Sequence, residues 1–287
     1  MDGIRKDGAR NIKLRKLSLK SGTYTGRMKL LCVWCALVLS VCSGCDSGAN
    51  TPNDNTPKDN DSELITDSTM VALRTECENA RGLGSVTSRD SEQPYLISAP
   101  HGTFDLYTAE IAESVCGLLG WNCVMARGYV VDGVRINVNR PTEGAGLSPE
   151  NEIRSDRATC VHEYFLHEAQ SVLFESETTF YVEIHGAGAI QDVQIATVGI
   201  LFDQAVRMKA VLQAAWNAQS GSSRTIHMEP VDSITFTARA SKERGMLSRF
   251  QPAIHIELPR AMREDERARV IQFLQNGLFT IAQNEFR

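Results

Sequence analysis

Two histidines in this sequence end an apolar run, and each is followed by a glycine. His101 comes after the apolar stretch of "YLISAPHG", and His185 ends the run of "FYVEIHG". Glycine has no side chain, so the backbone beside each histidine can turn sharply and a ligand can approach closely. Because imidazole is a common zinc ligand, two such histidines at strand ends predict a metal site.

Carboxylates lie near both histidines in the sequence. Asp105 follows His101 by four residues, which allows both side chains to bind one cation. Asp105 is equally suited to be the N-cap of a following helix, and Glu110 is a second carboxylate within that helix. Glu183 shares the strand face of His185 and could bind the metal directly or hold the imidazole by a hydrogen bond. We favour the hydrogen-bonding role for Glu183.

The stretch "VRINVNRP" carries an arginine at the end of a predicted strand. That strand would place Arg135, Asn137 and Asn139 on one face, with Arg140 just beyond its end. Arginine grips a carboxylate or a developing oxyanion through two parallel hydrogen bonds. Arg140 is therefore a candidate for substrate binding and catalysis, and the alternative is an arginine that braces a loop.

The stretch "AIHIELPR" places two polar side chains on one face of an apolar strand. His255 and Glu257 lie on this face, opposite Ile254 and Ile256. A carboxylate is costly to bury in such a segment unless it is paired or has a chemical role. General base toward a metal-activated water is one such role for Glu257, and a salt bridge with Arg260 is the alternative.

The elements that must position these groups alternate between strands and helices. This alternation predicts an α/β fold with a central mixed, mostly parallel sheet, in which sites form at strand ends. The predicted strands are 95–99, 123–126, 134–138, 180–184, 193–200 and 253–258, and the predicted helices are 105–119, 150–174, 203–219 and 262–284.

The first part of the chain is predicted to be a leader. Residues 1–45 combine a basic segment with an apolar run from Met28, which is a natural start, and end in "SGC", as in a lipoprotein signal peptide with Cys45 as the lipidated residue. Cys42 is a weaker alternative, and an uncleaved membrane anchor is another. Residues 46–69 are polar and predict a disordered tether, which leaves 70–287 as the folded domain.

Charge and cysteine content restrict the function. Residues 1–44 hold 9 of the 30 basic and 2 of the 35 acidic residues, so the remainder has 21 basic and 33 acidic residues and a net charge of −12. No basic patch stands out, and a nucleic-acid partner is not expected. Four cysteines of the domain could form two disulfides in three pairings or remain buried thiols, and lack the spacing of a zinc cluster. They are Cys77, Cys116, Cys123 and Cys160.

The order "PHG…NVNRP…VEIHG…IELP" resembles the N-formylglutamate amidohydrolase family, which is similar to zinc carboxypeptidases and to deacylases of N-acyl amino acids. The resemblance implies a three-layer α/β/α sandwich of the phosphorylase/hydrolase type with one catalytic zinc ion. It implies that His101 and His185 bind the metal, that Asn139 and Arg140 grip the substrate, and that Glu257 is the catalytic glutamate.

Two departures from the family pattern concern the carboxylates. Three residues separate His101 from Asp105, whereas carboxypeptidases have two between the corresponding histidine and glutamate. Relatives often carry aspartate two residues before the second histidine, where this chain has Glu183. Asp105 is the first candidate for the third metal ligand, with Glu110 as the fallback.

These observations predict a zinc-dependent hydrolase that cleaves an amide bond next to a carboxylate. The substrate would be an N-acyl amino acid, a peptide or a glutamyl compound. The leader predicts an exported bacterial lipoprotein, anchored by lipid on the outer side of the cytoplasmic membrane or in the outer membrane. The alternative is a non-catalytic surface lipoprotein that binds a peptide or carboxylate ligand on a degenerate hydrolase fold. A serine hydrolase is disfavoured because no Gly-x-Ser-x-Gly sequence is present.

Overall fold

The computed structural model describes residues 67–144, 152–173, 179–219 and 223–286. The chain divides into two compact units, Met1–Asp61 and Ser62–Arg287, and all of the described residues belong to the second. The predicted signal peptide, Cys45 and most of the predicted tether lie outside the described residues, so these remain predictions. Every helix in the described part of the chain is too short or too polar to cross a membrane.

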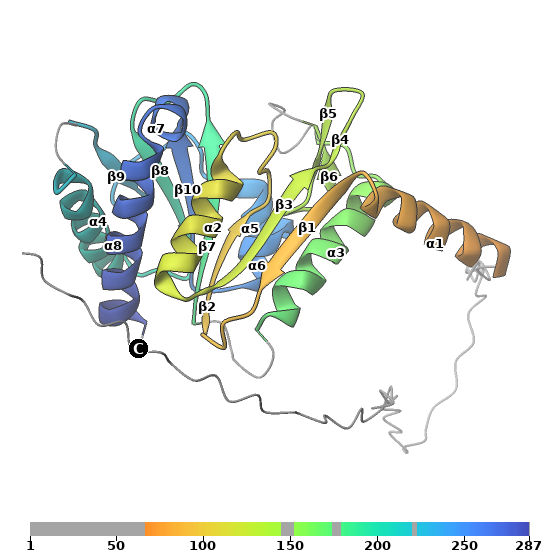
Figure 1. Cartoon of the computed structure of the whole chain (residues 1–287), viewed down its shortest axis with the longest axis horizontal. Coiled ribbons are helices and arrows are strands. Elements are labelled where there is room, and N and C mark those ends of the chain that lie inside the picture. The colour runs from red at the N-terminus through yellow and green to blue at the C-terminus, as the bar shows by residue number, and fades with distance from the viewer. Residues whose placement is uncertain (1–66, 145–151, 174–178, 220–222, 287) are drawn as a thin grey trace, which may run out of the picture. The chain divides into compact units, whose positions relative to one another are not determined.

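A seven-stranded mixed sheet forms the centre of the domain (Figure 1). Its strand order is β1-β3-β2-β7-β10-β8-β9. The four strands β3, β2, β7 and β10 run parallel, whereas β1 pairs antiparallel with β3 and β8 pairs antiparallel with β10. The strands are β1 (Gly84–Arg89), β2 (Tyr95–Ala99), β3 (Asn122–Gly128), β7 (Phe180–Ala187), β8 (Val193–Val198), β9 (Ile226–Met228) and β10 (Ala253–Pro259).

Helices cover both faces of this sheet, because the central strands are apolar on both sides. Along β7, Val182 and Ile184 belong to one hydrophobic core and Tyr181 to the other. The first core packs against α2 (Thr108–Leu119), α4 (Phe202–Asn217) and α8 (Arg267–Glu285). The second packs against α1 (Asp67–Arg81), α3 (Asp156–Ser171) and α6 (Met246–Arg249). The prediction of a three-layer α/β/α sandwich is therefore confirmed.

A small antiparallel sheet lies beside the main one and carries the predicted arginine stretch. It consists of β4 (Val130–Val131), β5 (Val134–Asn137) and β6 (Thr142–Glu143). The turn between β4 and β5 is Asp132-Gly133, and both residues have positive φ, 51° and 78°. Asp-Gly is the sequence that such a two-residue hairpin turn favours.

Several element boundaries differ from the sequence-based expectations. The helix expected from Asp105 begins at Thr108, because the backbone carbonyl of Asp105 accepts hydrogen bonds from the amide and hydroxyl groups of Thr108 in a preceding turn. The helix expected at 150–174 is Asp156–Ser171, and the Ser155 hydroxyl caps it. The closing helix is split into α7 (Arg260–Glu264) and α8.

Seven short or polar elements of the described residues were not expected from the sequence. They are α1, β1, β4, β6, β9, α5 (Arg239–Arg244) and α6. Helix α1 begins three residues before the expected domain start at 70, and Asp67, Ser68 and Thr69 form its first turn.

The four cysteines of the domain form two disulfides. Cys77 pairs with Cys160, which joins α1 to α3, and Cys116 pairs with Cys123, which joins α2 to β3. The Cα–Cα distances are 5.1 and 6.1 Å, within the range that a disulfide spans. The structure thus selects one of the three pairings that the sequence left open.

Candidate metal and hydrolase site

The candidate site lies at the carboxyl ends of the parallel strands β2, β7 and β10. Strands β7 and β10 are adjacent, with Glu183 opposite His255 and His185 opposite Glu257. Each strand therefore carries one carboxylate and one imidazole on the same face, in opposite order. On this face each carboxylate therefore has an imidazole as its neighbour on its own strand and another imidazole opposite it on the adjacent strand.

The loop between β2 and α2 brings His101 and Asp105 to these strands. The amide of Gly102 donates a hydrogen bond to the carbonyl of Ala126 at 2.9 Å, and the amide of Asp105 donates to the carbonyl of His101 at 2.7 Å. A Cβ atom at residue 102 would lie only 2.4 Å from Ala109 Cβ. Glycine is thus required by the close approach of this loop to α2, and the loop returns Asp105 to His101.

Gly186, the other glycine that follows a histidine, also allows a close contact. A Cβ atom there would lie 2.3 Å from Cζ of Arg263, so the guanidinium occupies the space of the missing side chain. The amide of Gly186 donates to Asp105 Oδ2 at 3.3 Å. Both glycines therefore help to place the Asp105 carboxylate.

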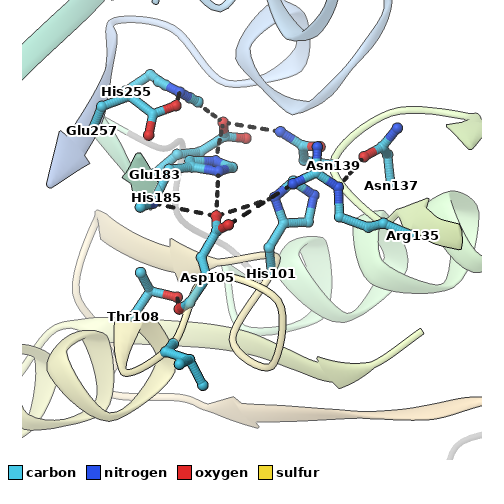
Figure 2. Close-up of polar contacts among 12 residues, drawn as sticks. His101, Asp105, Thr108, Arg135, Asn137, Asn139, Glu183, His185, His255 and Glu257 are labelled. Carbon is cyan, nitrogen blue, oxygen red and sulfur yellow. Dashed lines mark hydrogen bonds and ion pairs between the residues drawn. The ribbon is translucent and has the colours of Figure 1, made fainter. Parts of the chain in front are cut away.

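The side chains of His101, Asp105 and His185 converge (Figure 2). Asp105 Oδ2 lies 3.5 Å from Nδ1 of His101 and 3.5 Å from Nδ1 of His185. The two imidazole centroids are 4.9 Å apart. Zinc bonds of about 2.0–2.2 Å in a tetrahedron separate neighbouring ligand atoms by about 3.4 Å, so this arrangement has the dimensions of a zinc site.

His101 gives an independent indication that a ligand belongs here. Its side chain is buried, and both ring nitrogens lack a hydrogen-bond partner among the described residues. A buried polar atom without a partner costs about 1–3 kcal/mol. A metal ion at this position would satisfy one nitrogen of His101, and the donor set of two imidazoles and one carboxylate fits zinc.

The ionisation of the cluster follows from burial and from the pairs within it. Burial raises the pKa of Asp105, but the neighbouring imidazoles of His101 and His185 outweigh burial and hold the pKa well below its usual range. Burial lowers the pKa of His185, but hydrogen bonds with Asp105 and Glu183 raise it to about 9. Burial and the neighbouring Arg135 hold the pKa of His101 well below its usual value.

Glu183 is fully buried behind His185. Its Oε2 lies 3.3 Å from Nε2 of His185 and 2.9 Å from Nδ1 of His255, and its Oε1 accepts a hydrogen bond from the Tyr181 hydroxyl at 3.0 Å. Glu183, His185 and His255 form a second group close enough to hold an ion. Glu183 does not line the cavity described below, however, and hydrogen bonds already engage it. This arrangement supports the predicted role of Glu183 as the acceptor that orients the His185 ring.

Glu257 faces a cavity of about 460 Å³ together with the three candidate ligands. Its Oε1 is hydrogen-bonded to Nε2 of His255 at 3.1 Å, and it is buried like its neighbours. The alternative of a salt bridge between Glu257 and Arg260 does not apply, because Arg260 pairs with Glu264 on α7. Glu257 is thus placed where a general base toward a water in the cavity should be.

The two arginines of the "VRINVNRP" stretch have different surroundings. Arg140 is paired with Glu152, whose carboxylate also accepts hydrogen bonds from Thr142 and Arg244. Asn139 donates to Glu183 at 3.3 Å and accepts from Arg140 at 3.0 Å. Both residues of the predicted substrate-gripping pair line the cavity, but both are engaged within the protein.

Arg135 forms an ion pair with Asp105 of the metal cluster, a position that the sequence did not reveal. Its Nη1 lies 3.8 Å from Asp105 Oδ1, its Nε donates to Asn137, and its guanidinium stacks over Phe104. The shared strand face of Arg135 and Asn137 was the available signal. By contrast, Glu110, the fallback ligand, lies exposed on α2 near Arg127 and is not part of the cluster.

Comparison with solved structures identifies several hydrolases with related architecture. The N-formylglutamate amidohydrolase of Ralstonia eutropha JMP134 is 12% identical with a TM-score of 0.46, and the match covers 69% of this chain and 97% of that chain. A bacteriophage poly-gamma-glutamate hydrolase is 14% identical with a TM-score of 0.47, covering 72% and 95%. A metallo-carboxypeptidase of Burkholderia cenocepacia is 11% identical with a TM-score of 0.41, covering 76% and 69%.

The family that the sequence motifs resemble is among these matches. No protein-family model matches the sequence, and no curated protein matches it significantly. At identities of 11–14% the similarity concerns the fold, so the activity must be derived from the side chains of this chain.

Proposed function

We propose that this protein is a zinc-dependent hydrolase that cleaves an amide bond next to a carboxylate. The observation that carries the proposal is the convergence of His101, Asp105 and His185 at 3.5 Å spacings beside Glu257, on the wall of one cavity. The two unsatisfied nitrogens of His101 support the presence of an ion. One zinc ion per chain would be held by these three side chains.

A zinc ion bound there would act as a Lewis acid toward the scissile carbonyl and would acidify a water molecule in its open position. Glu257 takes the proton of the attacking water and passes it to the leaving nitrogen. Because the Glu257 carboxylate is buried, its attraction for the proton of the attacking water is less screened by solvent. Glu183 keeps the His185 ring in the orientation in which Nδ1 faces Asp105.

Arg135 is the side chain that we assign to the negative charge that develops on the carbonyl oxygen. It lies beside the metal cluster, and its guanidinium can donate several hydrogen bonds. Arg140 and Asn139 remain the proposed groups for the carboxylate of the substrate. Because Glu152 engages Arg140, binding through Arg140 would use the donors that Glu152 does not occupy.

The substrate class follows from the cavity and from the proposed location. A volume of about 460 Å³ accommodates a ligand the size of an N-acyl amino acid or a short peptide. The two disulfides fit an oxidising compartment and so support the proposed export. The lipid anchor at Cys45 is proposed from the leader sequence alone. Outside the cytoplasm the substrates would be peptides, N-acyl amino acids, cell-wall fragments or poly-γ-glutamate.

The alternative of a non-catalytic binding lipoprotein predicts a degraded metal site. Loss of the carboxylate ligand would favour it, but the Asp105 carboxylate lies 3.5 Å from His101 despite its unusual spacing in the sequence. The structure therefore gives no specific support to the alternative.

Metal analysis combined with a hydrolysis assay tests the proposal. The wild-type chain should retain one zinc ion after dialysis and release free amine from N-acyl glutamate, γ-glutamyl or short peptide substrates. Glu257→Gln should keep the zinc and lose activity by about 10²-fold or more. A zinc-replete Glu257→Gln protein with full activity would eliminate the proposed role of Glu257, and a metal-free active wild type would eliminate the zinc mechanism.

A further inference from the structure

A row of alternating acids and imidazoles runs from the metal cluster to the proposed general base. Asp105 contacts His185, His185 contacts Glu183, Glu183 contacts His255, and His255 contacts Glu257. Figure 2 shows the five side chains side by side. His255 is the one member of this row that the function proposed above does not use.

The surroundings of His255 leave it little freedom to move. Its side chain is 7% exposed, and its ring stacks on that of His185 with centroids 4.1 Å apart. Nδ1 lies 2.9 Å from Glu183 Oε2, and Nε2 lies 3.1 Å from Glu257 Oε1. Both ring nitrogens are therefore bonded, and Glu183 is itself held by Tyr181 and Asn139.

Glu257, in contrast, has a long side chain with several rotatable bonds, and it lies on the wall of the cavity. A glutamate has three rotatable side-chain bonds, and restricting them costs free energy unless a contact holds the carboxylate. The hydrogen bond to His255 occupies Oε1 and leaves Oε2 to take a proton from a water in the cavity. A small displacement of such a group can lower the rate by about 10²-fold.

We propose that His255 is a positioning residue, which holds the Glu257 carboxylate in its catalytic orientation through Nε2 while Glu183 anchors its Nδ1. This inference rests on the proposed function of Glu257, but the orientation itself can be measured without activity. The register between β7 and β10 makes the arrangement possible, because it places Glu183 directly opposite His255.

Two substitutions distinguish the hydrogen bond of His255 to Glu183 from its hydrogen bond to Glu257. In His255→Gln the side-chain amide can reach the position of Nε2 and still donate to Glu257, whereas in His255→Asn it reaches only the position of Nδ1. The structures of both variants, solved without metal, should show one Glu257 orientation in the Gln variant and several in the Asn variant. A single, wild-type Glu257 orientation in His255→Asn would overturn the proposal.

Kinetics provide the second readout. We expect His255→Asn to lower kcat by about 10- to 100-fold with little change in KM or zinc content, and His255→Gln to restore most of kcat. In the Glu257→Gln background, His255→Asn should have no further effect on kcat. Equal loss in the Asn and Gln variants, or full additivity with Glu257→Gln, would contradict the positioning role.

A measurement that leaves His255 unchanged covers the case in which the variants at position 255 do not fold. Nitrogen-15 NMR of the histidine rings should show that Glu257→Gln shifts the Nε2 resonance of His255 and leaves His162 unchanged. An unshifted His255 resonance would refute the contact. If the wild type binds no zinc and is inactive, the proposed function fails, while the structures and the NMR shifts still decide whether His255 holds Glu257.

Discussion

Asp105 Oδ2 lies 3.5 Å from His185 Nδ1, although one residue is in the loop after β2 and the other is within β7. The same oxygen lies 3.5 Å from Nδ1 of His101, so one carboxylate joins a histidine of the β2–α2 loop to a histidine of β7. All three side chains are buried, so removing the Asp105 carboxylate would take away the contact that the two imidazoles share.

Replacing Asp105 by asparagine should weaken zinc binding by more than about 100-fold, because a neutral amide replaces a charged ligand of similar shape. Zinc content after dialysis against a mild chelator, measured by atomic emission, checks this prediction. Glu110→Gln is the matched control, since Glu110 is an exposed carboxylate at the start of α2. Equal zinc content in the two variants would show that Asp105 is not a ligand.

Zinc affinity should rise with pH through the neutral range. In the metal-free protein the pKa of His185 is raised to about 9, so the ring is protonated at pH 7, although zinc requires a free Nδ1. Binding must then release a proton, and the apparent affinity should increase about tenfold per pH unit until the proton is already lost near pH 9. The low pKa of Asp105 adds no further dependence in this range.

Competition with a chelator of known affinity at several pH values, together with calorimetry in buffers of different ionisation enthalpy, measures this linkage. Release of about one proton per zinc ion at neutral pH is the expected result. An affinity independent of pH would show that His185 is neutral in the metal-free protein or is not a ligand.

The two arginines should respond differently to truncation. Arg135→Ala should lower kcat by about 10²- to 10³-fold without loss of zinc, because a donor to the developing oxyanion is removed. Arg140→Ala should instead raise KM, because a proposed contact to the substrate carboxylate is lost. It should also reduce the free energy of unfolding by about 1–3 kcal/mol, since it leaves the buried Glu152 carboxylate with fewer partners. Steady-state kinetics and urea unfolding separate the effects, and a full-rate Arg135→Ala enzyme would exclude the oxyanion role.

Gly102 should tolerate no side chain, because the surrounding atoms leave no room for a Cβ atom. Gly117, which has more room, serves as the control. Gly102→Ala places Cβ 2.4 Å from Ala109 and 2.8 Å from the carbonyl of Ala126, so the His101 loop must move. We expect weaker zinc binding and a loss of about 1–3 kcal/mol in unfolding free energy. Gly117→Ala, within α2 and with its nearest neighbour 3.4 Å away, should stabilise the protein by about 0.5–1 kcal/mol. A neutral Gly102→Ala would mean that the close approach does not constrain the site.

The site residues illustrate how much could be predicted from the sequence. His101, His185 and Glu257 were found because each lies in or just after an apolar strand, and strand ends in an α/β sheet converge at one edge. The contact of Arg135 with Asp105 was missed because it depends on how the β4-β5-β6 sheet packs against the loop of Asp105. Glu152 was missed because no local pattern marks a carboxylate that a distant arginine will pair.

By itself, the sequence determined the period-2 alternation of the strands, the apolar stripes of the long helices and the two His-Gly corners. These features depend on residues a few positions apart. Only the tertiary structure decided the pairing of β7 with β10, and with it the contact of His255 with both Glu183 and Glu257. It also decided the cysteine pairs and the return of Asp105 to His101. Register and loop closure are set by packing between segments distant in the chain, which local periodicity does not encode.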